Sequence, residues 1–225
     1  MNQDLASRKE RLTTPRAAAL AGIIFSVLLI TSLVLIRISV PADPQAAGSW
    51  LVGGSKNVSL ALNLVPFAGI AFLWFIGVVR DRIGEHEDRF FATVFLGSGL
   101  LFLAMLFTST ATAGGMISMY GAAASMLVES GIYAYNRAVT YEIMNVYAMK
   151  MAGVFMISTC TLALRTGIFP RWMAFLGLAL ALFLLFSIGF FSWASLVFPL
   201  WVLLISVYIL LVNFKRSRIE IEEIA

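Results

Sequence analysis

Four polar side chains lie close together at the start of an otherwise apolar segment. Lys150 is preceded by Glu142, Asn145 and Tyr147 within the segment from Tyr141 to Arg165. A lysine near the middle of such a segment costs about 2.5–3.5 kcal/mol on membrane-insertion scales, so it should face protein or a water-filled cavity. The ammonium group can there bind an anionic group or pair with a carboxylate from another helix.

These four residues share one broad face if the segment is an α-helix. At about 100° per residue, Glu142 and Lys150 lie about 80° apart, with Asn145 and Tyr147 beside them. The two charges are about 12 Å apart along the axis, which is too far for a direct salt bridge. We predict a polar stripe that lines an outward-facing cavity; the alternative is a lysine whose long stem extends toward the outer headgroups.

The composition places this segment in a membrane protein. Of the 225 residues, 60% are hydrophobic and 12% are charged, and the mean hydropathy is +0.92, whereas soluble domains carry roughly 25% charged residues. The formal net charge is +4, but the basic residues gather at the ends of apolar runs, as membrane insertion requires. The lipid bilayer is therefore the expected partner, and no nucleic-acid partner is expected.

Six apolar segments are long enough to cross a bilayer as helices. A hydrocarbon core of about 30 Å requires about 20 apolar residues. Continuous apolar runs favour helices because each helix satisfies its own backbone hydrogen bonds. We predict an all-α, polytopic integral membrane protein with six transmembrane helices at residues 17–37, 58–79, 90–111, 142–164, 172–190 and 194–214.

The distribution of lysine and arginine predicts the orientation. Twelve of the 16 basic residues fall in the N-terminal tail, in the second and fourth connections and in the C-terminal tail. Since the cytoplasmic side retains positive charge during insertion, both termini are predicted to be cytoplasmic. The predicted parts are a basic tail at 1–16, a six-helix membrane domain at 17–214 and a short charged tail at 215–225. A bacterial inner membrane is the expected location.

The connection at residues 112–141 is too apolar for a solvated loop. Counting it as a seventh span would reverse the sides of all later charged connections, which the charge rule opposes. We therefore predict an outer interfacial helical segment around residues 115–140. This segment would lie along or just above the membrane surface and can run on into the fourth span.

A proline interrupts the second predicted span. Pro66 lies inside this span, and Asn63 lies one turn before it. Such prolines usually kink a membrane helix and free a carbonyl that a neighbouring group covers. Asn63 and Pro66 are therefore a candidate helix kink, in which the Asn63 amide either caps the freed carbonyl or serves as packing between helices.

Residues typical of catalytic or metal sites are scarce. His86 is the one histidine, and it lies in the second connection among charged residues, where a solvated turn is expected. Cys160 and most methionines lie in apolar runs and are expected to pack. The sequence contains no nucleophile elbow, phosphate-binding glycine loop or zinc motif. No cofactor or metal is predicted, and an enzyme is not favoured.

The second connection carries a short motif. Gly77, Asp81, Arg82 and Gly84 in GVVRDRIG resemble the loop signature of major facilitator transporters, which falls at the same connection. The resemblance implies that Asp81 and Arg82 form a cytoplasmic loop that pairs with neighbouring helices and steadies one conformation. The match ends at Glu85, where the family has a basic pair, and it identifies no family for the whole chain.

Functions from different classes remain open. The first expectation is a small transporter or channel, working alone or as a homo-oligomer, with permeation along the polar stripe around Lys150. The alternative is a non-catalytic scaffold or accessory subunit of a larger membrane complex, whose polar groups meet a partner's helices. An intramembrane lipid-modifying enzyme is the third class. The sequence identifies neither a substrate nor a partner.

Overall fold

The computed structural model is helical throughout the part of the chain that it describes. It describes the backbone of residues 2–41, 55–83, 89–167, 169–186 and 193–222, and the side chains of residues 17–41, 55–80, 92–120, 130–167, 169–186 and 193–215. No strand occurs in the described residues. The predicted all-α class is therefore confirmed.

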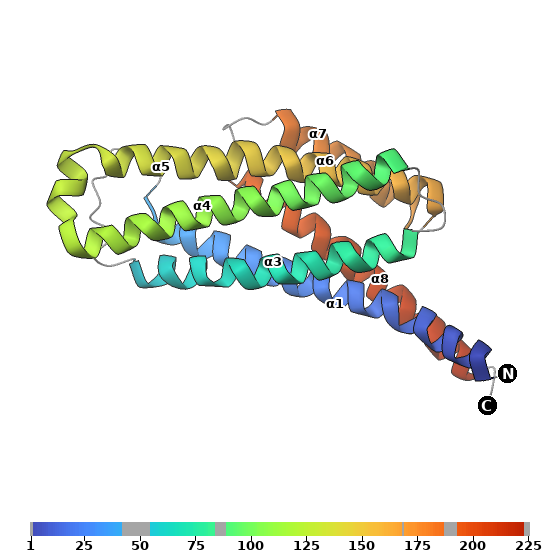
Figure 1. The fold of residues 1–225 in the computed structure, drawn as a ribbon. Helices are drawn as coiled ribbons and strands as arrows, with labels where there is room; N and C mark the ends of the chain where they lie inside the picture. Colours follow the sequence, from blue (N-terminus) through green and yellow to red (C-terminus); the bar gives the residue numbers. More distant parts are fainter. Residues whose placement is uncertain (1, 42–54, 84–88, 168, 187–192, 223–225) are drawn as a thin grey trace.

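Long helices joined by short connections make up the chain (Figure 1). They include a π-helix, η1, and a 3₁₀-helix, η2. In order they are α1 (Asn2–Ser39), α3 (Ser55–Ile83), α4 (Arg89–Glu129), α5 (Ile132–Glu142), η1 (Ile143–Ala148), α6 (Met149–Thr166), α7 (Arg171–Phe186), η2 (Ala194–Leu196) and α8 (Val197–Glu222). Because α5, η1 and α6 follow one another without a break, they form one continuous helix.

Five helices within the described residues are long and apolar enough to cross a membrane. Each overlaps one of the predicted spans: Ala17–Ser39, Ser55–Arg80, Ala92–Tyr120, Ile132–Thr166 and Ala194–Lys215. The remaining prediction, at 172–190, coincides with α7, which is apolar but has 16 residues. That is about 24 Å of helix. The structure thus confirms a set of apolar helices that suits a multi-pass membrane protein.

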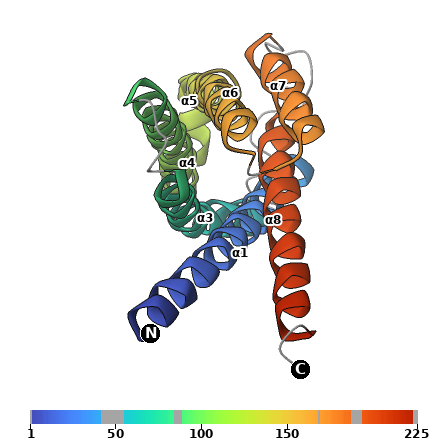
Figure 2. The ribbon, with the colours of Figure 1, turned by 90° about the vertical axis from the view of Figure 1, so that its right-hand side faces the viewer.

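The helices run back and forth along one axis and form a ring. Seen from one end, α3, α4, α6, α7, α8 and α1 follow one another around this ring (Figure 2). The N-terminal end of α1 and the C-terminal end of α8 lie at the same end of the bundle, which we call the terminal end (Figure 1). The opposite end, where α4 and α5 meet, is called the hairpin end.

Residues 115–140 differ from the interfacial helix that we predicted. The chain continues α4 as far as Glu129, and α5 then runs back beside it, so the two form a hairpin along the bundle axis (Figure 1). Gly131 makes the reversal with a φ of 74°, a left-handed conformation that glycine adopts without strain. The hairpin is favoured because its arms cover each other's side chains, Met116 against Tyr133. The continuation into the fourth span is confirmed for α5.

Five phenylalanine rings fill the middle of the ring of helices. Each of α1, α3, α4, α6 and α8 contributes one fully buried ring: Phe25, Phe72, Phe102, Phe155 and Phe198. Neighbouring ring centroids are 4.6–6.4 Å apart, and most pairs are edge-to-face or tilted, as the charge distribution of aromatic rings favours. We call this group the phenylalanine layer. It joins five helices at one level of the bundle.

Glycines let the helices approach closely around the phenylalanine layer. A Cβ on Gly99 of α4 would lie 2.7 Å from Ile76 Cδ1 and 3.2 Å from the Phe155 ring. A Cβ on Gly153 of α6 would lie 3.2 Å from the carbonyl oxygen of Ala181 on α7. Close approach of this kind gains the packing on which association of membrane helices depends.

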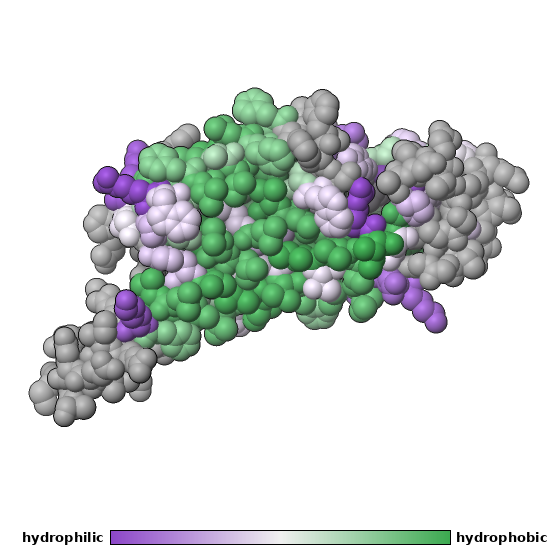
Figure 3. Space-filling view, turned by 180° about the vertical axis from the view of Figure 1, so that it is seen from behind, coloured by the Kyte–Doolittle hydropathy of each residue, from purple (hydrophilic) through white to green (hydrophobic). Residues whose placement is uncertain are grey.

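The outside of the bundle is apolar across its middle. Hydrophobic side chains cover a broad band of the face in Figure 3, and hydrophilic side chains gather toward its two ends. Exposed tryptophans come from separate elements, Trp74 from α3, Trp172 from α7 and Trp193 from the connection before α8. Tryptophan is enriched where a membrane protein meets the lipid headgroups. A bilayer therefore fits around this band.

Removing a ring from the phenylalanine layer should destabilise the bundle. Phe72→Ala would leave a cavity among four other rings, and we expect the free energy of unfolding in detergent to fall by about 3–5 kcal/mol. Phe67 lies on the same helix and is 62% exposed, so Phe67→Ala should change this free energy by no more than about 0.5 kcal/mol. Denaturant titrations of both variants test this. Equal losses would mean that the layer does not hold the helices together.

Candidate functional site

The polar residues predicted as a site surround a π-helix. The segment η1 lies between Glu142 and Lys150 and contains Asn145 and Tyr147. A π-turn is wider than an α-turn because its hydrogen bonds join residues five apart. The angle between Glu142 and Lys150 that we expected from an α-helix therefore does not apply. Short π-segments inside α-helices are frequent at functional sites, which keeps this region a candidate.

The four side chains differ in exposure. Glu142 and Tyr147 are exposed, whereas Asn145 and Lys150 are half-buried. The Asn145 amide donates to the backbone carbonyl of Tyr141 on its own helix, 3.1 Å away. The exposed members thus face the surroundings of the bundle, and the Asn145 amide already has a local acceptor.

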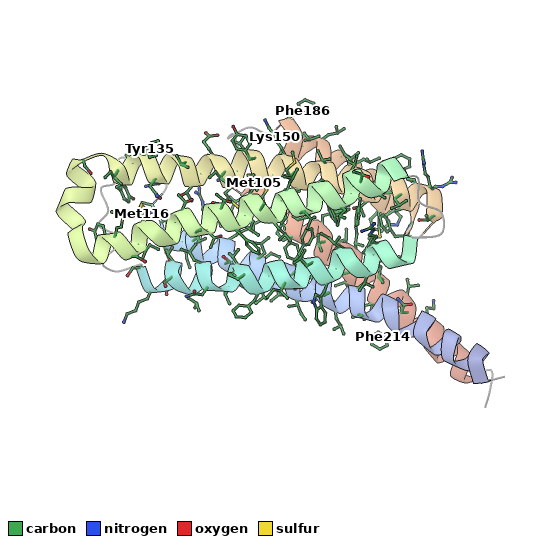
Figure 4. All side chains as sticks on the ribbon, viewed as in Figure 1. Met105, Met116, Tyr135, Lys150, Phe186 and Phe214 are labelled. Atoms are coloured by element: carbon green, nitrogen blue, oxygen red, sulfur yellow. The ribbon has the colours of Figure 1, made fainter. Side chains whose placement is uncertain are left out.

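Lys150 lies on the hairpin side of the phenylalanine layer. It precedes Phe155 by five residues, so its Cα lies about 7.5 Å from the layer along the axis. Here α6 packs antiparallel on α7, where a Cβ on Gly153 would lie 3.1 Å from Leu185 Cγ. Lys150 is one turn beyond Gly153 and is therefore level with the end of α7. In Figure 4, Lys150 and Phe186 lie along the same edge of the molecule.

The connection into α8 packs against the π-helix. Its 3₁₀ segment η2 contacts both η1 and α1. The guanidinium carbon of Arg37 on α1 lies 5.8 Å from the centre of the Trp193 ring, which is within the range of a cation–π interaction. A cation and an aromatic ring therefore fix α1 to this connection on the hairpin side of the phenylalanine layer.

Polar side chains join the two arms of the hairpin. The Ser109 hydroxyl of α4 donates to the Thr140 carbonyl at 3.0 Å, and the Asn136 amide of α5 donates to the Thr112 carbonyl at 3.3 Å. The backbone N–H of Ile143, the first residue of η1, bonds to the same Thr140 carbonyl. Ser109 therefore supplies a second donor at the point where the helix widens into the π-turn.

The candidate kink lies within a continuous helix. α3 runs through Pro66 without interruption, and the side chains of Asn63 and Pro66 are both exposed. The Ser32 hydroxyl of α1 donates to the Ala61 carbonyl, 2.8 Å away. Since Pro66 has no N–H to donate to the neighbouring carbonyl, Ser32 supplies a polar group beside this gap. Sequence reasoning did not find Ser32, because no local pattern relates it to Pro66.

The motif of the second connection is only partly described. Asp81 and Arg82 belong to the last turn of α3, which ends at Ile83. Their side chains, together with residues 84–88, lie outside the described residues. The role that the resemblance implies for Asp81 and Arg82 therefore stays a prediction.

An apolar cavity of about 30 Å³ lies on the terminal side of the phenylalanine layer. α1, α3, α6 and α8 supply its walls, together with Phe169 from the connection after α6. Thr159 is the one hydroxyl residue in the walls, and it donates to the Phe155 carbonyl at 2.7 Å. This cavity suits hydrocarbon and offers little to a polar solute.

Two buried donors on α8 remain without partners in the described part of the chain. They are the indole N–H of Trp201 and the hydroxyl of Ser206. Trp201 lies against Gly177 of α7, where a Cβ would come within 2.5 Å of its Nε1. Ser206 lies against Gly22 of α1. Both donors thus face the close contacts through which α8 meets its neighbours.

Comparisons with family models, with curated proteins and with solved structures found no match. The class therefore comes from the fold itself. Long apolar helices, packed in a ring around an aromatic layer, define an α-helical multi-pass membrane protein. Within the described ranges, no group of three or more His, Cys, Asp or Glu side chains comes together to hold a metal ion.

Removing the Ser109 hydroxyl should loosen the π-helix. Ser109→Ala takes away one donor to the Thr140 carbonyl, and we expect faster amide hydrogen exchange in η1. We also expect a stability loss of about 0.6 kcal/mol, the average for such bonds between membrane helices. Ser118 is an exposed serine of the same helix that donates to Gly114, so Ser118→Ala is the matched control. Identical exchange in the two variants would contradict this role of Ser109.

Proposed function

We propose that the chain is a non-catalytic membrane subunit that holds a partner at its hairpin end and does not conduct through its own centre. The observation that carries this proposal is the phenylalanine layer, because five fully buried rings from five helices occupy the middle of the ring. A pathway for ions or polar solutes needs polar or charged groups, or a wettable constriction, at that place. Tightly packed aromatic rings are a seal rather than a filter.

The position of the phenylalanine layer supports a hairpin that projects from the membrane. Phe25 lies nine residues after Arg16 and twelve before Arg37, or about 14 and 18 Å along the helix. These distances bracket a hydrocarbon core of about 30 Å, with the layer near its middle. From Phe102, α4 continues for 27 residues to Glu129, about 40 Å. The hairpin then extends on the order of 25 Å beyond the core.

The exposed side of the hairpin is apolar and aromatic. Ile132 is 46% exposed, Tyr135 73% and Met119 53%, whereas Ser109 and Asn136 spend their polar groups between the two arms. This is the reverse of a hairpin that ends in water. Tyr and Met are enriched at protein interfaces, and an apolar patch outside lipid marks an interaction surface.

Small residues follow one exposed stripe of α4 along this hairpin. The members are three or four residues apart, and all four are exposed: Thr108, Ala111, Gly115 and Ser118. Small side chains at this spacing let a second helix approach closely in a membrane protein. A helix of a partner protein is therefore the occupant that we propose for this surface.

A second candidate function is permeation, as a small transporter or channel. The observation that favours it is the half-buried Lys150 beside a π-turn. Because the phenylalanine layer fills the centre, such a path would run past Lys150 on the outside of the ring, between copies of the chain. Glu142, Asn145 and Tyr147 would then line a polar cavity that two or more copies complete.

We propose six spans in a bacterial inner membrane, with the terminal end in the cytoplasm. The basic residues at the terminal ends of α3, α6, α7 and α8 support this orientation, since cytoplasmic ends retain positive charge. These residues are all exposed: Arg80, Arg165, Arg171 and Lys215. The span formed by α7 would be the shortest of the six.

Filling the small-residue stripe should abolish assembly with the partner. A Cβ on Gly115 or on Gly97 would meet nothing within 4 Å, so neither Gly115→Leu nor Gly97→Leu should disturb the fold. We expect Gly115→Leu to shift the chain from a larger complex to the free form in blue native electrophoresis of solubilised membranes. Gly97→Leu, inside the apolar band of the same helix, should leave the complex intact. Retention of the complex in both variants would refute the proposed surface.

Thiol labelling of position 150 should separate the two candidate functions. In a Cys160→Ala background, Lys150→Cys should resist a membrane-impermeant thiol reagent from either side if the chain is a sealed subunit. Labelling from outside would instead favour permeation beside this residue. Lys215→Cys is the control for orientation, because Lys215 is exposed at the terminal end. It should react only after the membrane is permeabilised, and reaction in intact cells would reverse the proposed topology.

A further inference from the structure

The apolar cavity on the terminal side of the phenylalanine layer lies at the depth of a lipid tail. Its walls include Ala18 of α1, Val79 of α3, Ala163 of α6 and Ile209 of α8. A buried water needs two to four polar partners, and the one wall hydroxyl already donates within its own helix. Hydrocarbon is therefore the occupant that the lining favours.

Positive charge lies next to the walls of this cavity. Arg80 directly follows the wall residue Val79, and Arg171 comes two residues after the wall residue Phe169. Both arginines are exposed. Guanidinium groups between membrane helices attract anionic lipid headgroups, and each basic residue near such a surface contributes about 1 kcal/mol. The charge next to the cavity thus matches a phosphate group.

The distances along α3 fit one lipid molecule. The wall residues Phe75 and Val79 precede Arg80 by five and one residues, or about 7.5 and 1.5 Å of helix. A phosphate held at Arg80 would therefore place the first methylenes of its acyl chain beside the cavity. The cavity of about 30 Å³ takes a short part of that chain, and the rest lies in the surrounding bilayer.

We propose that this cavity and the two arginines form a binding site for an anionic phospholipid of the leaflet at the terminal end. Methylenes near the glycerol occupy the cavity, and the phosphate meets Arg80 and Arg171. The site is separate from the partner surface at the hairpin end, so either proposal can fail without the other. A bound lipid would fill the space between α3, α6 and α8 that protein side chains leave empty.

Native mass spectrometry of the full chain in detergent tests this site. The probes are dioleoyl phosphatidylglycerol and dioleoyl phosphatidylcholine, which share their acyl chains and differ in net charge. The unaltered chain should bind one phosphatidylglycerol more tightly than phosphatidylcholine. The double variant Arg80→Gln and Arg171→Gln should bind phosphatidylglycerol roughly 30-fold more weakly, since two basic residues are removed. Equal affinity for the two lipids in the unaltered chain would overturn the proposal.

Two further variants test the cavity itself. Ala163→Leu fills it and should weaken binding of both lipids, whereas Ala179→Leu, at an exposed position of α7, should have no effect. If Ala163→Leu does not fold, Ile209→Val enlarges the cavity by one methyl group and should tighten binding. Unchanged binding in the cavity variants, or displacement of the lipid by glycerol phosphate alone, would overturn the proposal by reducing the site to a headgroup contact.

Discussion

The meeting of five phenylalanine rings at one level of the bundle is the constraint on which the rest of the structure depends. In a bilayer the lipid tails are as apolar as the side chains, so helices associate through packing rather than through removal of apolar surface from water. Large rigid rings suit this task because each makes many dispersion contacts. Their rings come from α1, α3, α4, α6 and α8, which fixes the relative heights of these helices. Glycines beside the rings then set how closely the backbones approach.

The phenylalanine layer separates two regions with different chemistry. On its terminal side a small apolar cavity remains between α1, α3, α6 and α8, and exposed arginines lie next to it. On its hairpin side, α4 and α5 are joined by hydroxyl and amide donors to backbone carbonyls, and they expose apolar and aromatic side chains. The first region suits lipid and the second suits protein. A closed centre explains how one small bundle can carry both surfaces without leaking.

The apolar helices could be predicted from the sequence, because span length and hydropathy are properties of consecutive residues. The hairpin could not, since the choice between a surface helix and a hairpin rests on contacts such as Met116 with Tyr133. The π-helix has no local residue pattern, and it changed the face on which Lys150 was expected. The donor beside Pro66 comes from Ser32 on another helix. The chain has 18 phenylalanines, and which five meet depends on the relative heights of separate helices.

The interaction free energy between Phe155 and Phe198 tests the role of the phenylalanine layer most directly. These rings join α6 to α8 with their centroids 5.9 Å apart and their planes at 89°. A double-mutant cycle of Phe155→Leu and Phe198→Leu, measured by unfolding in detergent, keeps an apolar side chain at both positions. If the layer holds the helices together, the coupling should be about 0.5–1.5 kcal/mol. Effects that add to within about 0.3 kcal/mol would contradict this role.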